Sequence, residues 1–208
     1  MSQTPKYDLY HAPRTRSVRV RWLLGEMGLP CTLHDVQFAS RPPGDENYGE
    51  VHPLRKVPAF QDGDTSVFES LAICQYILGK NPGSPLEVTP DEPDYGRYLQ
   101  WLHFGEAGMM MPVSMLLAHT TLLPEDKRDP GIVAWGRYET GKILTFLSEH
   151  AIADREFIAA DRFTAADISI TYMLFLLKVI REFGDAPENL KTYFKKMTSR
   201  EAWVIATG

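Results

Sequence analysis

Two residue pairs are the clearest candidates for a binding site in this sequence: Val57 with Pro58, and Glu69 with Ser70. Proline donates no amide hydrogen, so Pro58 fits only the start or edge of a strand, and a cis bond before it would turn the Val57 backbone toward solvent. That backbone could then pair with an extended peptide. Ser70 opens a predicted helix whose N-terminus can hold a carboxylate, while Glu69 can hold an ammonium group. The two pairs could therefore bind a peptide that carries an α-amino acid head group.

The elements that must position these pairs alternate between strands and helices over the first 80 residues. Short β-type patterns predict strands at 6–11, 31–38, 57–62 and 65–68. Apolar residues at helical spacing predict helices at 18–27 and 70–78. Asp62-Gly63-Asp64 is typical of a hairpin turn, and residues 39–55 are expected to be mostly irregular. The order predicts an α/β domain over residues 1–80.

The strand patterns stop after this domain. Residues 79–93 contain four prolines and two glycines, and we expect 81–93 to be a linker. Helical patterns follow at 95–118, 132–150, 165–183 and 187–197. Gly108 and Pro112 should interrupt the first of them, and Thr164 with Asp167 has the spacing of a capping box. Residues 94–208 are therefore predicted to form an all-helical domain.

Composition and charge exclude several classes of function. The 208-residue chain has a net charge of −5, and its only basic concentration is a short run of arginines at 14–21. We expect no nucleic-acid partner. No apolar run approaches about 20 residues, so we expect no membrane span. Cys31 and Cys74 have no metal-binding spacing, which favours a reduced cytoplasmic location and no metal.

The segment around the two pairs resembles the N-P-x-G-x-V-P-x-L … D-G … E-S-x-A-I element of cytosolic glutathione transferases. It reads HPLRKVPAF at 52–60, DG at 62–63 and FESLAI at 68–73. His52 replaces the usual Asn and Arg55 the usual Gly, although theta-class enzymes also carry a basic residue at that Gly position. A second similarity lies at 157–168, which resembles the start of the central helix of the family's helical domain, with Ala160 where Gly is frequent. The resemblance spans almost the whole chain.

This resemblance implies a thioredoxin-like glutathione-binding domain followed by an all-helical second-substrate domain. In the family the Val-Pro bond is cis and the valine backbone pairs with the cysteinyl part of glutathione, which assigns those roles to Val57 and Pro58. Glu69 and Ser70 would hold the γ-glutamyl end. Lys56 resembles a lysine that some classes direct toward the glycyl carboxylate. Glutathione is then the substrate, and no metal is implied.

The catalytic group of such enzymes stabilises the glutathione thiolate from the turn between the first strand and the first helix. Thr15 matches the first serine of an S-R-S-x-R pattern that resembles a fungal and bacterial transferase group, and Ser17 is the second candidate. Arg14, or backbone amides near it, is a third and belongs to the expected glutathione-binding set. Either hydroxyl could instead only cap the helix. Tyr7 and Tyr10 leave a tyrosine-type site open, whereas Cys31 lies past the helix, which argues against a cysteine-type site.

The second-substrate pocket is expected to be apolar and deformable. Methionine is frequent in the first helix of the second domain, and methionine-rich surfaces suit varied apolar ligands. The alternative for these side chains is plain core packing. The expected pocket residues are Phe104, Met109 and Val113 from that helix, with His11 and Pro13 from the first domain.

The resulting hypothesis is a glutathione S-transferase of the EC 2.5.1.18 type, acting in detoxification on a small hydrophobic electrophile. By resemblance we expect a homodimer. Isomerisation, dehalogenation, ether cleavage and peroxide reduction would use the same thiolate. The alternatives are a glutathione-dependent peroxidase or reductase, although a reductase would want a cysteine near Thr15, and a non-catalytic binding or interaction protein of the same fold.

Overall fold

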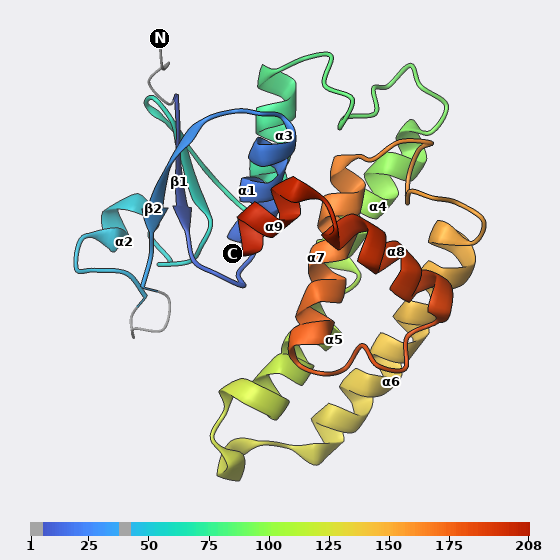
Figure 1. The fold of residues 1–208 in the computed structure, drawn as a ribbon. Helices are drawn as coiled ribbons and strands as arrows, with labels where there is room; N and C mark the ends of the chain where they lie inside the picture. The colour runs from blue at the N-terminus through green and yellow to red at the C-terminus, as the bar shows by residue number, and fades with distance from the viewer. Residues whose placement is uncertain (1–5, 38–42) are drawn as a thin grey trace. The chain divides into compact units, whose positions relative to one another are not determined.

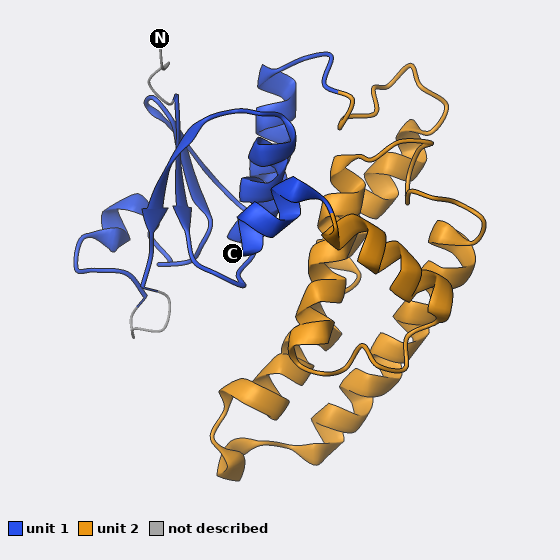
Figure 2. Ribbon diagram, viewed as in Figure 1, with its two compact units in different colours: residues 1–84, 200–208 blue, residues 85–199 orange. Residues whose placement is uncertain are grey.

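The computed structural model describes residues 6–37 and 43–208, which form two compact units (Figure 2). The first unit comprises residues 1–84 together with 200–208, and the second comprises residues 85–199. The segment 200–208 therefore belongs to the first unit, whereas the sequence prediction assigned it to the helical domain. No helix formed by the described residues is long and apolar enough to cross a membrane.

A four-stranded sheet with the order β2-β1-β3-β4 is the centre of the first unit (Figure 1). Its strands are β1 (Tyr7–His11), β2 (Cys31–Asp35), β3 (Ala59–Asp62) and β4 (Thr65–Phe68). β1 pairs parallel with β2, whereas β3 pairs antiparallel with both β1 and β4. The register places Leu9 opposite Phe60, and both side chains are fully buried. The four strands follow the predicted order along the chain, and β3 begins two residues after the predicted start at residue 57.

The helices of the first unit are α1 (Ser17–Glu26), α2 (Tyr48–Val51), α3 (Ser70–Lys80) and α9 (Glu201–Thr207). Figure 1 shows α1 and α3 on one side of the sheet and α2 on the other. Gly28 has φ +62°, the left-handed backbone that ends a helix at glycine. The apolar faces of α1 and α3 bury residues such as Val20, Leu23 and Ile77 completely.

Two further differences from the prediction lie between β1 and β3. The strand predicted at 31–38 ends at Asp35, and Phe38 lies outside the described residues. The region 39–55, predicted to be mostly irregular, contains the single helical turn α2 at Tyr48–Val51. Four residues are too few to show a helical period in the sequence, so this element left no pattern to detect.

The second unit is helical throughout its regular elements. They are α4 (Tyr95–Ala107), α5 (Met110–Leu117), η1 (Ala118–Leu122), η2 (Glu125–Lys127), α6 (Pro130–Phe146), η3 (Leu147–Ile152), α7 (Ala165–Val179) and α8 (Glu188–Thr198). The chain breaks between α4 and α5 at Gly108, as predicted. A Cβ at Gly108 would overlap the Phe104 ring, so glycine permits this close turn.

The helix α7 is the buried centre of this unit. Its predicted capping box is present: Asp167 accepts hydrogen bonds from the Thr164 backbone amide at 2.8 Å and the Thr164 hydroxyl at 3.1 Å. The same carboxyl group accepts from the Ile158 amide and the Tyr193 hydroxyl, each at 2.9 Å. These bonds connect the loop before α7 to α8 and fix where the helix begins.

Candidate active site

The turn between β1 and α1 brings Thr15 and Ser17 together. Their hydroxyl oxygens lie 2.8 Å apart. The Thr15 hydroxyl donates to the Ala12 carbonyl at 2.7 Å, and the Ala12 amide donates to the Ser17 hydroxyl oxygen at 3.2 Å. Both hydroxyls thus lie at the N-terminal end of α1, where the helix dipole favours a negative charge.

The two hydroxyls differ in their access to solvent. Ser17 is completely buried, whereas Thr15 is half-buried. Beneath Ser17 the His11 ring is also buried, with its Nδ1 atom 2.7 Å from the serine oxygen. Burial, together with the charge of Arg21, lowers the pKa of His11 to about 4. His11 is therefore neutral at pH 7 and occupies a polar network under the turn.

Arg14 occupies the outer part of the same turn. Its side chain is exposed and its backbone has φ +61°, a left-handed conformation that non-glycine residues rarely adopt. Strained backbone of this kind concentrates at functional sites. The arginine is thus placed at the surface of the turn, while the two hydroxyls lie behind it and further along the chain.

The Val57-Pro58 peptide bond is cis, as the resemblance implied. Val57 precedes the first paired residue of β3, Ala59, whose partner on β1 is Tyr10. The Val57 side chain is buried in a cluster with Ala12 and Val36. This packing fixes Val57 near the turn that carries the hydroxyls.

His52 and Arg55, the two residues that differ from the motif of the resembled family, each make hydrogen bonds that suit their positions. The ring nitrogen Nδ1 of His52 accepts a hydrogen bond from the Leu54 amide at 3.2 Å, as an asparagine side-chain oxygen can in a turn. Arg55 has φ +49°, which explains why glycine suits this position. Its guanidinium donates to the carbonyls of Asp45 and Glu46, each at 2.8 Å. Lys56 is exposed, and its carbonyl accepts from a tyrosine hydroxyl at 2.7 Å.

The second pair forms the N-terminus of α3. Glu69 is exposed and precedes the helix with φ +66°, again a strained conformation for a non-glycine residue. Ser70 is buried and its hydroxyl accepts a hydrogen bond from the buried Arg19 guanidinium at 3.1 Å. A positive side chain thus lies behind a helix N-terminus, so both the dipole and the charge favour an anion there. The run of arginines at 14–21 is visible in the sequence, but the contact of Arg19 with Ser70 spans 51 residues and has no local signature.

The expected second-substrate residues lie in separate units. His11 and Pro13 line a cavity of about 640 Å³ in the first unit, together with Arg21. In the second unit, Phe104 is half-buried and packs edge-on against Trp101. Met109 and Val113 are buried, with 0% and 1% of their surfaces exposed.

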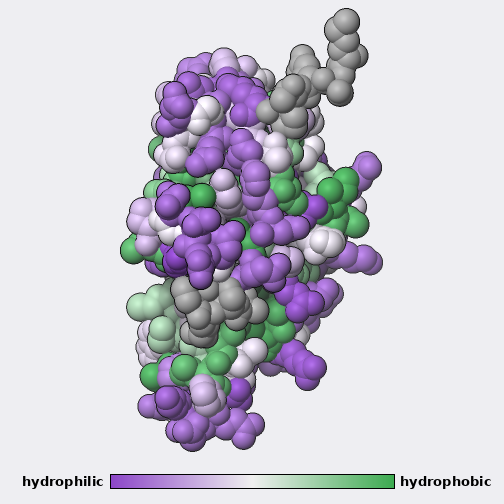
Figure 3. Space-filling model, turned by 90° about the vertical axis from the view of Figure 1, so that its left-hand side faces the viewer, coloured by the Kyte–Doolittle hydropathy of each residue, from purple (hydrophilic) through white to green (hydrophobic). Residues whose placement is uncertain are grey.

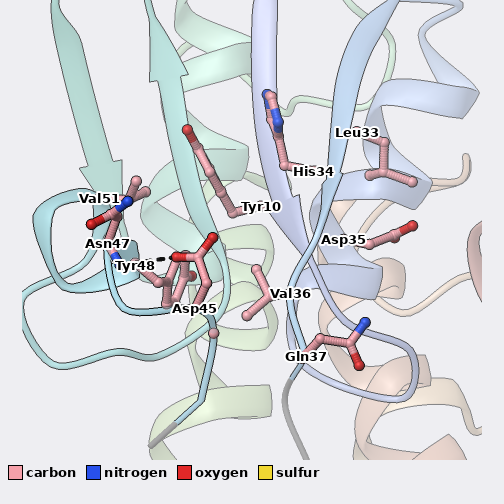
Figure 4. A pocket seen from close by; sticks show the side chains of 11 residues that line it. Tyr10, Leu33, His34, Asp35, Val36, Gln37, Asp45, Asn47, Tyr48 and Val51 are labelled. Atoms are coloured by element: carbon pink, nitrogen blue, oxygen red, sulfur yellow. Dashed lines mark hydrogen bonds between the residues drawn. The ribbon is translucent and has the colours of Figure 1, made fainter. Parts of the chain in front are cut away.

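A second cavity of the first unit, about 550 Å³, contains Tyr10, one of the two alternative tyrosines, but none of the expected catalytic, glutathione-binding or second-substrate residues. It lies on the α2 side of the sheet, where Tyr10 stacks on His34 with 4.6 Å between ring centres (Figure 4). Asp35 and Asp45 line it with carboxylates.

The face of the molecule shown in Figure 3 is largely hydrophilic, with scattered apolar residues.

The cysteines are poorly suited to be nucleophiles. Burial raises the pKa of the Cys74 thiol to about 12 and also raises the pKa of Cys31. A thiol with a raised pKa is rarely ionised at pH 7.

Of the two strand tyrosines, Tyr7 is buried and its hydroxyl oxygen accepts from the side-chain amide of Asn81, while burial raises the pKa of Tyr10. Among residues 6–37 and 43–208, no three acidic, histidine or cysteine side chains form a group that could hold a metal ion.

Comparison with known proteins finds similarity to glutathione transferases. Residues 5–79 match the family model of the glutathione S-transferase N-terminal domain. Glutathione S-transferase 3 of Schizosaccharomyces pombe is 25% identical over 95% of this chain and 85% of the relative. Glutathione S-transferase F13 of Arabidopsis thaliana is 29% identical over 74% of this chain and 73% of the relative.

Solved structures show the same fold. A glutathione transferase family member from Pseudomonas fluorescens, crystallised with two glutathione bound, covers 99% of this chain and 94% of its own. Its TM-score is 0.87 at 24% sequence identity. The thioredoxin-like sheet with a following helical region is therefore the fold of glutathione transferases. The N-terminal domain match and the curated relatives also identify glutathione transferases as the proteins to which this chain is similar.

Proposed function

We propose that this protein is a glutathione transferase in which Thr15 stabilises the thiolate of glutathione. The observation that carries the assignment is the difference in access at the start of α1. Thr15 is half-buried and can meet a ligand, whereas Ser17 is completely buried beneath it. The two hydroxyls are in contact, so Ser17 supports Thr15 from behind.

The chemistry follows from the ionisation of the thiol. A free thiol has a pKa near ~8.5, so only a few per cent is ionised at pH 7. A hydroxyl donor and a helix N-terminus each favour the anion by about 1 kcal/mol, which lowers the pKa by one unit or more. The thiolate then forms a carbon–sulfur bond with the electrophile. The leaving group departs with its bonding electron pair, and the thiol proton goes to solvent.

The remaining contacts hold the tripeptide in a single register. The Val57 backbone pairs with the cysteinyl part of glutathione. The N-terminus of α3, with Ser70 and the positive charge of Arg19 behind it, binds the γ-glutamyl carboxylate. Glu69 holds the α-ammonium group, and the exposed Lys56 faces the glycyl carboxylate. Arg14 lies at the surface of the turn and contributes positive charge toward the anionic substrate.

The second substrate is proposed to be a small hydrophobic electrophile. In the first unit, His11 and Pro13 line a cavity that can contribute to its binding. In the second unit, Phe104 offers a partly accessible aromatic face, with Met109 and Val113 in the layer below the surface. We further propose a cytoplasmic homodimer, for which sedimentation analysis should give twice the chain mass of 23.6 kDa.

Titration of bound glutathione tests the assignment of Thr15. The absorbance of the thiolate is followed against pH for the wild type, Thr15→Val and Thr15→Ser, alongside conjugation of a model electrophile. Valine keeps the shape but removes the hydroxyl, so we expect the thiol pKa to rise by about one unit and kcat/KM to fall at least tenfold. Serine should restore most of both. If Thr15→Val leaves the thiol pKa unchanged, Thr15 is not the stabilising group.

A further inference from the structure

Four polar side chains contact one another in sequence, from Arg21 on α1 through His11 and Ser17 to Thr15 in the turn between β1 and α1. The guanidinium nitrogen Nη1 of Arg21 lies 3.4 Å from Nε2 of His11. The other ring nitrogen, Nδ1, is 2.7 Å from the Ser17 hydroxyl oxygen. That oxygen is in turn 2.8 Å from the hydroxyl oxygen of Thr15. The distances form a continuous sequence that ends at the residue proposed to meet the thiol.

Arg21 determines which nitrogen of His11 carries the hydrogen. A guanidinium group can donate hydrogen bonds but cannot accept them. Nε2 must therefore accept from Arg21, and the neutral ring carries its hydrogen on Nδ1, which donates to Ser17. The ring is neutral at pH 7 because burial and Arg21 lower its pKa to about 4, while Asp35 on β2 acts in the opposite direction.

The hydroxyl of Ser17 must then act as a donor to a group other than His11. Its oxygen accepts from Nδ1 of His11 and from the Ala12 amide at 3.2 Å, which uses both lone pairs. The hydroxyl hydrogen has two acceptors in reach, the Ala12 carbonyl at 3.2 Å and the Thr15 oxygen at 2.8 Å. When Ser17 donates to Thr15, the Thr15 hydrogen is left to donate to the Ala12 carbonyl or to a ligand.

We propose that His11, oriented by Arg21, is a positioning residue: it directs the hydrogen of Ser17 to Thr15, which leaves the hydrogen of Thr15 for the sulfur of glutathione. The inference rests on the proposed function, and it adds a reason why Thr15 acts as a donor. Without the hydrogen on Nδ1, Ser17 can rotate and accept from Thr15. Thr15 then offers the thiolate a lone pair in place of a hydrogen, which disfavours the anion.

Two amide variants of His11 form a matched pair. In His11→Asn the amide nitrogen lies near the position of Nδ1 and can donate to Ser17. In His11→Gln the longer side chain carries its amide toward Arg21, near the position of Nε2. Both variants are polar and neutral, so differences between them report on the direction of the hydrogen bond more than on burial of a polar group.

The measurement is the pKa of the bound glutathione thiol, read from thiolate absorbance, together with kcat and KM. For His11→Gln we expect the thiol pKa to rise by about one unit and kcat to fall about tenfold, with KM for glutathione changed less than about threefold. His11→Asn should recover most of the loss. Ser17→Ala should match His11→Gln, and the double variant should be no worse than either alone, because both interrupt one chain.

Equal thiol pKa values in the wild type, His11→Gln and Ser17→Ala would overturn the positioning role of His11, while the glutathione transferase assignment would stand. Losses that add fully in the double variant would also overturn it. Thermal unfolding checks that each variant is folded, and Ser17→Ala supplies the test if a His11 variant is not. A wild-type protein that neither binds glutathione nor lowers its thiol pKa would instead contradict the proposed function itself.

Discussion

Arg55 shows how one residue can satisfy a backbone position that suits glycine. Its φ of +49° has a steric cost of about 1 kcal/mol for a residue with a Cβ. The side chain offsets this cost by donating to the carbonyls of Pro43, Asp45 and Glu46. These bonds hold the segment that leads into α2, so the arginine acts on the loop as well as on its own turn.

Removing the Arg55 side chain should therefore destabilise the protein by an amount that depends on the replacement. Arg55→Ala keeps the strain and loses the hydrogen bonds, and we expect a loss of about 1–3 kcal/mol. Arg55→Gly loses the same bonds but relieves the strain, so its stability should lie between the wild type and alanine. Urea unfolding measures both. A glycine variant less stable than the alanine variant would contradict this account.

Individual site residues were predictable where a local pattern marked them. Val57-Pro58 and Glu69-Ser70 combine unusual residue types with fixed spacing, and the structure has the cis bond and the helix start expected there. His11 was expected only to line a pocket. Its contact with Ser17 depends on how α1 packs against β1, and a separation of six residues has no local signature. The roles assigned to these residues in binding and catalysis remain predictions.

Among the elements, α7 depends on a carboxyl group placed entirely out of water. Asp167 is completely buried and accepts four hydrogen bonds. Burial nevertheless raises its pKa to about 6, above the ordinary value of 3.8. A carboxyl group with a raised pKa in the folded state binds its proton more tightly than in the unfolded chain, so its contribution to stability falls as the pH rises between those two values.

The direction of this pH dependence can be measured by comparing the wild type with a variant that has no titrating group at position 167. We expect the difference in unfolding free energy between the wild type and Asp167→Asn to decrease by about 2–3 kcal/mol from pH 4 to pH 7. Chemical denaturation at several pH values gives this difference, and other titrating groups cancel in the comparison. An increase over the same range would show that the four donors lower the pKa of Asp167 below its ordinary value.

The longer elements were predicted because their apolar periods are long enough to detect. The helices α1, α3, α4, α6 and α7 all begin within two residues of their predicted positions. The short helices α2 and α9 were not predicted, because four and seven residues give too little periodicity. The α9 helix forms because Trp203 packs on Trp22 with 4.7 Å between ring centres and Arg200 pairs with Glu26 at 2.7 Å.

At the scale of the whole molecule, the chain leaves the first unit at residue 84 and returns to it at residue 200. The returning helix α9 packs on α1, where Gly25 allows close approach to Ala202. Long-range returns of this kind depend on three-dimensional packing, so the sequence pattern alone could not assign 200–208 to the first unit. The helix whose N-terminus carries Thr15 and Ser17 is thus supported by contacts such as Arg200 with Glu26, which are 174 positions apart in the sequence.

A pair of substitutions in α9 tests this support. Trp203 is 5% exposed, and Trp203→Ala should lower the unfolding free energy by about 3 kcal/mol, as is typical for truncating a buried tryptophan. The matched control is Val204→Ala, because Val204 is 57% exposed and should change stability by less than about 0.5 kcal/mol. If the two variants are equally stable, α9 does not stabilise the first unit.

A crystal structure of the protein with glutathione bound tests the central claim most directly. The account predicts that the sulfur lies within about 3.5 Å of the Thr15 hydroxyl oxygen. It also predicts the γ-glutamyl carboxylate at the N-terminus of α3 on Ser70, and the cysteinyl backbone paired with Val57. A tripeptide bound elsewhere, or a sulfur held by another side chain with Thr15 still turned to the Ala12 carbonyl, would contradict it.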